Sequence, residues 1–249
     1  MRIAILSDIH SNLEALEAVL EDVKRRGYDR MVCLGDVVGY GADPERCVEI
    51  VREVVSKDEN GVESVVRGNH DDASAGGDDS YFNPEARLAV RWTRDHLTKQ
   101  SFEWLASLPY GIYEEDYYLV HSSPYKPEEW NYVTSMNEAY TAFKNFKERI
   151  AFIGHSHVPF HVGLSANGEE LFVENDNTIR FKDGYRYISN VGSVGQPRDG
   201  DTRACYVILD LSEGTLERVR VNYPVEIAAE KIRQGGLPTF LADRLSLGR

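Results

Sequence analysis

Histidine, aspartate and asparagine recur in five short clusters, each of which follows an apolar run. The clusters are Asp8-Ile9-His10, Gly35-Asp36, Gly68-Asn69-His70-Asp71, His121 and Gly154-His155-Ser156-His157. An apolar run that ends in such residues is typical of a buried strand that presents side chains at its C-terminal end. Mixed carboxylate, amide and imidazole ligands suit Mn, Fe, Co, Ni or Zn. The pattern therefore predicts a metal site at the ends of several strands.

A pair of metal ions sharing one bridging ligand would suit an in-line displacement by hydroxide. Ions about 3.5–4 Å apart clamp the attacking and leaving oxygens of an in-line displacement. They also lower the pKa of a bound water toward about 7, so that hydroxide is available at neutral pH. The clusters contain enough carboxylate and imidazole groups for two such ions.

The elements that position the first cluster are a strand over residues 2–7 and a helix after it. Ser11 is the predicted N-cap of this helix, and Glu14 completes a capping box three residues later. Apolar residues follow at helical spacing, and basic residues occupy the last turn before Gly27. A basic last turn and a glycine are both favourable at a helix C-terminus.

The strand–helix–strand order then repeats. Predicted strands cover Arg30–Leu34 and Ser64–Arg67, and a predicted helix covers Pro44–Val55 between them. The first three clusters are separated by about one βαβ unit each, since such a unit takes ~30 or more residues. The ligand candidates therefore recur at the carboxyl edge of one parallel sheet, where open α/β sheets bind ligands.

Residues 72–116 interrupt this order and predict a helical insertion beside the site, within a single domain of residues 1–249. Asp72–Ser80 reads as a polar loop, followed by helices over Pro84–Thr98 and Ser101–Leu108. The strands predicted after the insertion are Tyr117–Val120, Ile150–Ile153, Leu171–Val173, Thr178–Phe181, Tyr185–Ser189, Ala204–Leu211 and Leu216–Tyr223. A helix over Val225–Gln234 and a short helix after Pro238 close the chain.

Composition restricts the environment and the partners. The 249 residues are 42% hydrophobic and 28% charged, which indicates a folded globular protein. The net charge of -13 disfavours binding to duplex nucleic acid but not to a small anionic substrate near a metal. No apolar stretch approaches the ~18 residues of a membrane span and no signal peptide is evident, so we expect a cytoplasmic protein. Three cysteines without close pairing argue against a disulfide framework.

The five clusters, in this order over residues 8–157, resemble the motifs of the calcineurin-like metallophosphoesterase superfamily. The chain length, the helical insertion and residues 236–245 are similar to the small prokaryotic phosphodiesterase-like and diadenosine-tetraphosphatase-like members. The resemblance implies an α/β fold, a four-layer α/β/β/α sandwich with its metal site at the C-terminal edge of the strands.

The resemblance also implies a role for each ligand candidate. Asp8, His10 and His157 would bind one metal ion, Asn69, His121 and His155 would bind a second, and Asp36 would bridge both. The ions would be two divalent transition metals, manganese, Fe, Zn, Co or Ni. His70 would face the substrate, as a general acid or as a stabiliser of transition-state charge. The attacking species would be a metal-bridging hydroxide.

The chain departs from the protein Ser/Thr phosphatases of this superfamily in one motif. Their Gly-Asp-x-x-Asp-Arg-Gly corresponds here to Gly35-Asp36-Val37-Val38-Gly39-Tyr40-Gly41. The Asp that orients the catalytic histidine and the Arg that grips phosphate are both absent. This departure argues against a protein phosphatase and leaves the orienting partner of His70 open.

Further residues are weaker candidates. Tyr40 and Arg198 are predicted to bind substrate, with a packing aromatic and a surface salt bridge as the alternatives. Asp71 would either orient a histidine or cap a turn. His96 and His161 match no motif and are predicted to be surface or packing histidines. The aromatic residues that would line an inserted wall or, more often, the core are Tyr81, Phe82, Trp92, Trp104, Tyr125 and Trp130.

These observations favour a binuclear-metal-dependent phosphoester hydrolase, a phosphodiesterase acting on small or nucleotide-type substrates. The alternatives are a phosphomonoesterase or dinucleoside polyphosphate hydrolase and, from another class, a non-catalytic protein-binding scaffold. Ligand loss would indicate a scaffold, and no ligand position is lost here. A DNA nuclease is disfavoured by the acidic charge. The expected partner is a small phosphorylated substrate, with no membrane; the metal identity and the oligomeric state stay open.

Overall fold

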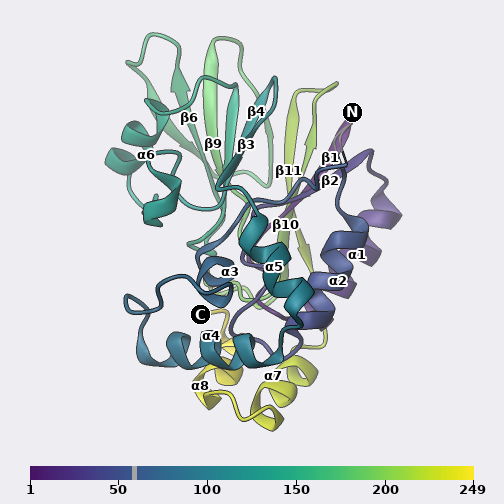
Figure 1. The fold of residues 1–249 in the computed structure, drawn as a ribbon. Helices are drawn as coiled ribbons and strands as arrows, with labels where there is room; N and C mark the ends of the chain where they lie inside the picture. The colour runs from purple at the N-terminus through teal and green to yellow at the C-terminus, as the bar shows by residue number, and fades with distance from the viewer. Residues whose placement is uncertain (58–60) are drawn as a thin grey trace.

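A computed structural model describes residues 1–57 and 61–249, which form two mixed β-sheets with helices on their outer faces (Figure 1). The strands of the first sheet are β1 (Arg2–Leu6), β2 (Arg30–Cys33), β8 (Thr178–Arg180), β10 (Ala204–Asp210) and β11 (Thr215–Val221). The strands of the second are β3 (Gly111–Tyr113), β4 (Tyr117–Val120), β5 (Ile150–Ile153), β6 (Phe160–Ser165), β7 (Leu171–Glu174) and β9 (Tyr185–Asn190).

The strand orders are β2-β1-β10-β11-β8 and β3-β4-β5-β9-β6-β7. β1 pairs with β2 in parallel, and β5 pairs in parallel with both β4 and β9. The other pairs are antiparallel. Each sheet therefore has a parallel part whose carboxyl ends carry the ligand candidates.

The helices cover the two outer faces. They are α1 (Leu13–Arg26), α2 (Pro44–Val54), α3 (Asn69–Ser74), α4 (Pro84–His96), α5 (Lys99–Ser107), α6 (Met136–Phe143), α7 (Val225–Gln234) and α8 (Thr239–Asp243), with 3-10 turns at Pro127–Glu129 and Leu245–Leu247. In Figure 1, α1 and α2 lie beside the first sheet, α6 lies beyond the second, and α4, α7 and α8 gather at one end.

Three apolar cores separate the four layers. On β1, Ile3 and Ile5 join the core between the two sheets, whereas Ala4 and Leu6 join the core beneath α1, α2 and α7. This alternation is the period-two pattern of a strand buried on both faces. A third core packs α6 against the outer face of the second sheet. The predicted four-layer α/β/β/α sandwich is therefore confirmed.

The predicted N-cap of the first helix was wrong. Asn12 caps α1, because its Oδ1 accepts a hydrogen bond from Ala15 N at 3.1 Å. Ser11 instead has a left-handed backbone with φ 54°, and its N–H donates to Val37 O. Glu14 closes no capping box and pairs with Lys231 of α7.

Two further boundaries differ from the predictions. Ser64–Arg67 is not a strand: Val65 makes one parallel bridge to Cys33, and the Arg67 N–H then turns to Pro109 O at 2.7 Å. Asp72–Ser80 is not all loop, since α3 continues through Ser74. The predictions also missed β3, β6 and α6.

Two expectations about the covalent and membrane context are consistent with the described residues. The three cysteines, Cys33, Cys47 and Cys205, are buried and free. None of the helices in residues 1–57 and 61–249 combines the length and the apolar character needed to cross a bilayer.

Candidate metal centre

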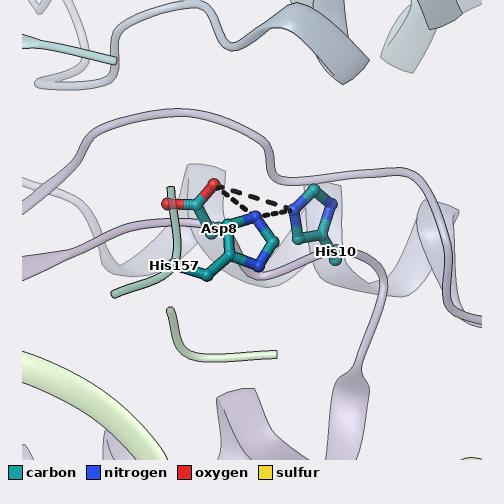
Figure 2. A group of neighbouring side chains, drawn as sticks. All are labelled: Asp8, His10 and His157. Carbon is teal, nitrogen blue, oxygen red and sulfur yellow. Dashed lines mark hydrogen bonds and ion pairs between the residues drawn. The ribbon is translucent and has the colours of Figure 1, made fainter. Parts of the chain in front are cut away.

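Asp8, His10 and His157 lie together where the loops after β1 and β5 meet (Figure 2). The loop after β1 is bonded to the loop after β2, since Asp8 N donates to Gly35 O at 3.0 Å and His10 N donates to Asp36 O at 2.9 Å. His155 N donates to Asp8 Oδ2 at 3.0 Å, which ties in the loop after β5. Loops from both sheets are thus fastened to one another at a buried point.

The backbone at this point is strained. Left-handed φ values occur at Asp8 (53°), His10 (52°), Asp36 (48°), His155 (65°) and His157 (60°). Such conformations are uncommon for non-glycine residues and cost roughly 1–3 kcal/mol each, so they persist where the surrounding contacts enforce them. Their concentration in the ligand candidates is typical of a functional site.

Four histidines each place one ring nitrogen against a backbone carbonyl. The contacts are His10 Nδ1 to Val38 O (3.1 Å), His121 Nδ1 to Leu34 O (2.8 Å), His157 Nδ1 to Gln196 O (2.6 Å) and His155 Nε2 to Trp130 O (2.9 Å). A carbonyl only accepts, so the ring nitrogen that faces it carries a proton, and in the neutral ring the other nitrogen keeps a lone pair. Metal-binding histidines commonly donate their second nitrogen in this way.

The first group leaves lone pairs facing one another. His157 Nε2 lies 3.0 Å from His10 Nε2 and 3.1 Å from Asp8 Oδ1. Asp8 Oδ1 accepts no hydrogen bond from any residue that the structure describes. Facing acceptors at this distance repel unless a proton or a metal cation lies between them. The donor set of one carboxylate and two imidazoles therefore fits a divalent transition metal.

A second group surrounds Asp36. Its Oδ2 lies 3.3 Å from His121 Nε2 and 3.6 Å from His10 Nε2, so it reaches both groups. Asn69 Oδ1 lies 3.3 Å from His121 Nε2. His155 joins Asp36 and His121 in a buried set that could hold an ion. The structure thus brings together all seven residues predicted as metal ligands, with Asp36 in the middle.

The electrostatics of the centre favour positive charge. Burial alone would raise the pKa of the Asp8 and Asp36 carboxyls. Instead, the neighbouring His157 holds the pKa of Asp8 well below its usual range, and His121 does the same for the pKa of Asp36. Burial lowers the pKa of His121, yet Asp36 outweighs it and raises the pKa to about 9. Burial lowers the pKa of His155 to about 4, which leaves that ring neutral. The two ionised carboxylates therefore favour positive charge in the centre, which is carried by a proton on His121 or by a metal cation that takes its place.

His70 differs from the four carbonyl-bonded histidines. Its Nδ1 is buried and has no hydrogen-bond partner in the described part of the chain. Its ring packs against Tyr40 at 4.3 Å and edge-on against Phe82 at 4.7 Å. Burial holds the pKa of His70 well below its usual range. Because His70 also groups with His10 and Asp36, proximity alone does not separate it from the ligands.

Gly39 explains why no carboxylate orients His70. A Cβ at position 39 would fall onto His70 Nδ1, and the glycine has a φ of +94°. A protein phosphatase would carry its orienting Asp at this position. Here the close approach of the loop and the imidazole leaves room only for glycine.

A cavity of about 250 Å³ opens above these residues. It is lined by Asp36, Tyr40, Asn69, His70, Tyr81, Phe82, Asn83, Ala86, Glu129, Trp130, Tyr132, His155, His157 and Arg198. The Arg198 guanidinium lies 5.6 Å from the Tyr40 ring and donates to Gln196 Oε1 at 2.8 Å. No carboxylate pairs with Arg198 among the described residues, so the alternative of a surface salt bridge finds no partner there.

The remaining candidates lie in supporting positions. Asp71 accepts from Val38 N and Gly68 N, each at 3.1 Å, and so braces the loops; in residues 1–57 and 61–249 it forms no hydrogen bond with a histidine. Burial raises the pKa of Asp71 to about 7. His96 stacks on Trp92, and His161 Nδ1 lies 2.9 Å from Ser189 Oγ.

Of the six aromatic candidates, Tyr81, Phe82 and Trp130 line the cavity, and the other three do not. Trp92 donates to Gly235 O at 2.8 Å, and Trp104 donates to Glu63 Oε2. Tyr125 is exposed outside the cavity. Core packing thus holds for Trp104, which is 7% exposed.

Sequence reasoning missed several contributors. Tyr132 stacks on His155 with ring centres 4.0 Å apart, and Asn83 and Glu129 line the cavity. They follow no motif, so nothing in the chain around them signals the site. Ser7 precedes Asp8 and donates to its Oδ2 at 2.6 Å; its position directly before a ligand was the available signal.

Comparison with known proteins gives consistent results. The calcineurin-like phosphoesterase superfamily domain matches residues 1–214. An uncharacterised protein of Methanocaldococcus jannaschii is 41% identical over 253 residues, covering 99% of this chain and 98% of that protein. A metallophosphoesterase structure from Sphaerobacter thermophilus is 38% identical with a TM-score of 0.85, covering 100% of this chain and 99% of the other. A Pyrococcus horikoshii OT3 protein structure, 20% identical with a TM-score of 0.79 and covering 100% and 98%, shares the fold.

Proposed function

This chain belongs to the calcineurin-like phosphoesterase superfamily, and we propose that it is a binuclear-metal-dependent phosphodiesterase acting on small or nucleotide-type substrates. The observation that carries the proposal is the set of facing lone pairs of His10, His157 and Asp8, together with an ionised Asp36 that reaches both histidine groups. Bound divalent ions would polarise the phosphoryl oxygens and lower the pKa of a coordinated water.

The seven candidate ligands would divide between two ions according to which residues lie together. Asp8, His10 and His157 would hold one ion, and Asn69, His121 and His155 the other, with Asp36 shared. The backbone carbonyls hold each imidazole in one orientation, which keeps the lone pairs on target without reorganisation. The chain would thereby place the phosphoryl group at the floor of the cavity.

Two side chains would act on the substrate itself, and a third would position them. His70 lies in the cavity wall, and its Nδ1 is buried against Gly39 without a hydrogen-bond partner among the described residues. Its Nε2 would therefore be the nitrogen that donates to the leaving oxygen or to a phosphoryl oxygen. Arg198 would pair with a phosphoryl oxygen. Tyr40 packs on both His70 and the Arg198 guanidinium and would hold these two groups in place.

The charges in the cavity wall support a diester over a monoester. A diester carries one negative charge on its phosphate, whereas a monoester carries up to two near neutral pH. Among the residues that the structure describes, the wall offers a single arginine, Arg198, and two carboxylates: Asp36, which belongs to the centre, and Glu129, which is paired with Lys126. One free cation in this described wall matches the single charge of a diester. The arginine that protein phosphatases use against phosphate is replaced here by Tyr40.

A substrate panel tests the proposal. Manganese-reconstituted protein would be assayed with a bis-aryl phosphate, an aryl monophosphate, cyclic nucleotides and a dinucleoside polyphosphate. We expect the diesters to have the highest kcat/KM. A higher kcat/KM for the monophosphate would contradict the diester assignment, and metal-loaded protein that turns over none of the esters would favour the scaffold alternative.

His70→Ala separates the chemistry from metal binding. We expect turnover of the diester to fall by ~10²-fold or more, the scale of a lost acid or donor. The metal content, measured by mass spectrometry of the elements, should be unchanged. His96→Ala is the matched control, since His96 packs on Trp92 outside the cavity. Unchanged turnover in His70→Ala would remove this residue from the mechanism.

A further inference from the structure

We infer that the cavity binds the nucleobase of a nucleotide ester by stacking on Tyr81 and Tyr132. The inference rests on the proposed function and deepens it, because it names the part of the substrate that the protein recognises beyond the phosphate. It follows from two pairs of side chains that come from different segments and line the same cavity.

The first pair is Tyr81 and Phe82, which precede α4. Their rings stack with centres 4.6 Å apart and an interplanar angle of 30°. Phe82 is only 8% exposed and packs edge-on against His70. Tyr81 is 51% exposed although it lines the cavity. Phe82 therefore covers one side of the Tyr81 ring and leaves an open aromatic surface next to the catalytic candidate.

The second pair is Trp130 and Tyr132, in the segment between β4 and α6. Tyr132 stacks on His155 with ring centres 4.0 Å apart and an interplanar angle of 17°, yet it is 49% exposed. Trp130 packs edge-on to His121, with ring centres 6.2 Å apart, and its carbonyl accepts from His155. Contacts with the centre thus hold this pair, and Tyr132 offers a second open aromatic surface.

Open aromatic surfaces in a cavity wall favour a planar ligand. Stacking on tyrosine buries apolar area and satisfies the ring quadrupole in an offset arrangement. The cavity of about 250 Å³ lies just below the ~300–1,000 Å³ of sites for drug-sized ligands. It therefore suits one ring system and a phosphate rather than a protein loop.

The polar groups in the wall distinguish a nucleobase from a plain aryl ring. Asn83 accepts from Ala86 N at 2.8 Å through Oδ1, which leaves its amide N–H groups as donors. Glu129 lines the same cavity, and its carboxylate, which already accepts from Lys126 Nζ and Asn131 Nδ2, keeps further lone pairs for a donor. A nucleobase edge carries both acceptors and donors, so it can pair with both residues, whereas an unsubstituted aryl ring can pair with neither.

Equilibrium binding tests this inference without relying on turnover. Adenosine 5′-monophosphate and ribose 5-phosphate carry the same phosphate and sugar and differ in the base. Calorimetric titration of manganese-loaded protein should show adenosine 5′-monophosphate binding about tenfold more tightly or better, about 1.4 kcal/mol, as expected for one stacked base. Phosphate release would be monitored in the same samples.

Variants locate the base. Tyr81→Leu and Tyr132→Leu should each reduce the preference for adenosine 5′-monophosphate by about threefold or more and leave ribose 5-phosphate affinity unchanged. Tyr81→Phe should retain the preference because it keeps the ring. Tyr113→Leu is the matched control, since Tyr113 is 61% exposed, stacks on Tyr118 and lies outside the cavity.

The outcomes separate this inference from the proposed function. Equal affinity for the two phosphates, in protein that hydrolyses diesters, would overturn the base site and leave the phosphodiesterase standing. A preference that survives both leucine substitutions would overturn the assignment to these tyrosines. A preference lost with the tyrosines, in protein that hydrolyses no ester, would support the base site and reject the hydrolase.

Discussion

At the scale of single residues, backbone carbonyls set the chemistry of the centre. Val38, Leu34, Gln196 and Trp130 each supply the carbonyl that fixes one imidazole tautomer. A carbonyl cannot exchange roles as a hydroxyl can, so each histidine presents one lone pair in one direction. His70 lacks such a carbonyl, and this absence among the described residues is the local feature that distinguishes it from the ligands.

Asp36→Asn tests whether one carboxylate serves both metal groups. The substitution keeps the shape of the side chain. It also keeps an oxygen that can accept the hydrogen bond that the backbone N–H of His70 now donates to Asp36 Oδ1 at 2.8 Å. We expect occupancy at both sites to fall together, since the shared negative charge is lost. Metal stoichiometry of the purified variant measures this, with the exposed Asp78→Asn as control. Loss of a single ion would contradict sharing.

At the scale of elements, the ends of parallel strands deliver the ligand candidates, and the following turns orient them. Asp8 follows β1, Asp36 follows β2, and His155 follows β5. Gly154 lets the loop after β5 lie close to the loop after β1, because a Cβ at position 154 would collide with Ser7 Oγ and Asp8 Oδ2. Asn12 connects α1 to the same region, as its Nδ2 donates to Gly195 O at 2.8 Å while its Oδ1 caps the helix.

Two substitutions at Asn12 separate its two contacts. Asn12→Ala removes both and should lower the free energy of unfolding by about 1–2 kcal/mol. Asn12→Ser keeps an uncharged cap acceptor for Ala15 N and loses only the donor to Gly195 O, so its loss should be smaller. Urea unfolding measures both variants. Equal losses would show that the cap contributes nothing measurable to stability.

At the scale of the whole molecule, the centre fastens together chain segments that are far apart in sequence. His10 and His157 meet across 147 positions, and Asp8 accepts from His155 across the same separation. The two ionised carboxylates are buried there, with 0% and 1% exposure for Asp8 and Asp36. If metal ions occupy this point, removing them would leave buried negative charge and facing lone pairs, which would destabilise the junction of the two sheets.

Chelation should therefore lower thermal stability. A metal at about 1,000 times its dissociation constant stabilises the folded state by about 4 kcal/mol. For a chain of this size, each kcal/mol shifts Tm by roughly 2–4 °C, so a chelator should lower Tm by about 10 °C. Differential scanning calorimetry at pH 7 measures the shift, and added manganese should restore it. A Tm unaffected by chelation would argue against metal in the folded protein.

Local patterns in the sequence predicted most of the scaffold because they report burial. β1, β2, β4 and β5 are apolar runs with ligands at their ends, and α7 spans the predicted Val225–Gln234. The prediction failed where local patterns were weak. Ser64–Arg67 was read as a strand from its apolar residues, but it makes a single bridge beside β2. β6 includes His161 and Gly163, which obscured its strand character.

The sequence by itself determined the types of the ligand candidates and their placement at strand ends, since both depend on residues adjacent in the chain. Only the tertiary structure decided which nitrogen of each imidazole faces the centre, because the carbonyls that fix the tautomers come from distant loops. The tertiary structure also decided which residues line the cavity. Tyr132, for example, belongs to no motif and lies in the cavity wall because it stacks on His155. Long-range contacts of this kind arise from sheet packing and loop paths, which local spacing does not encode.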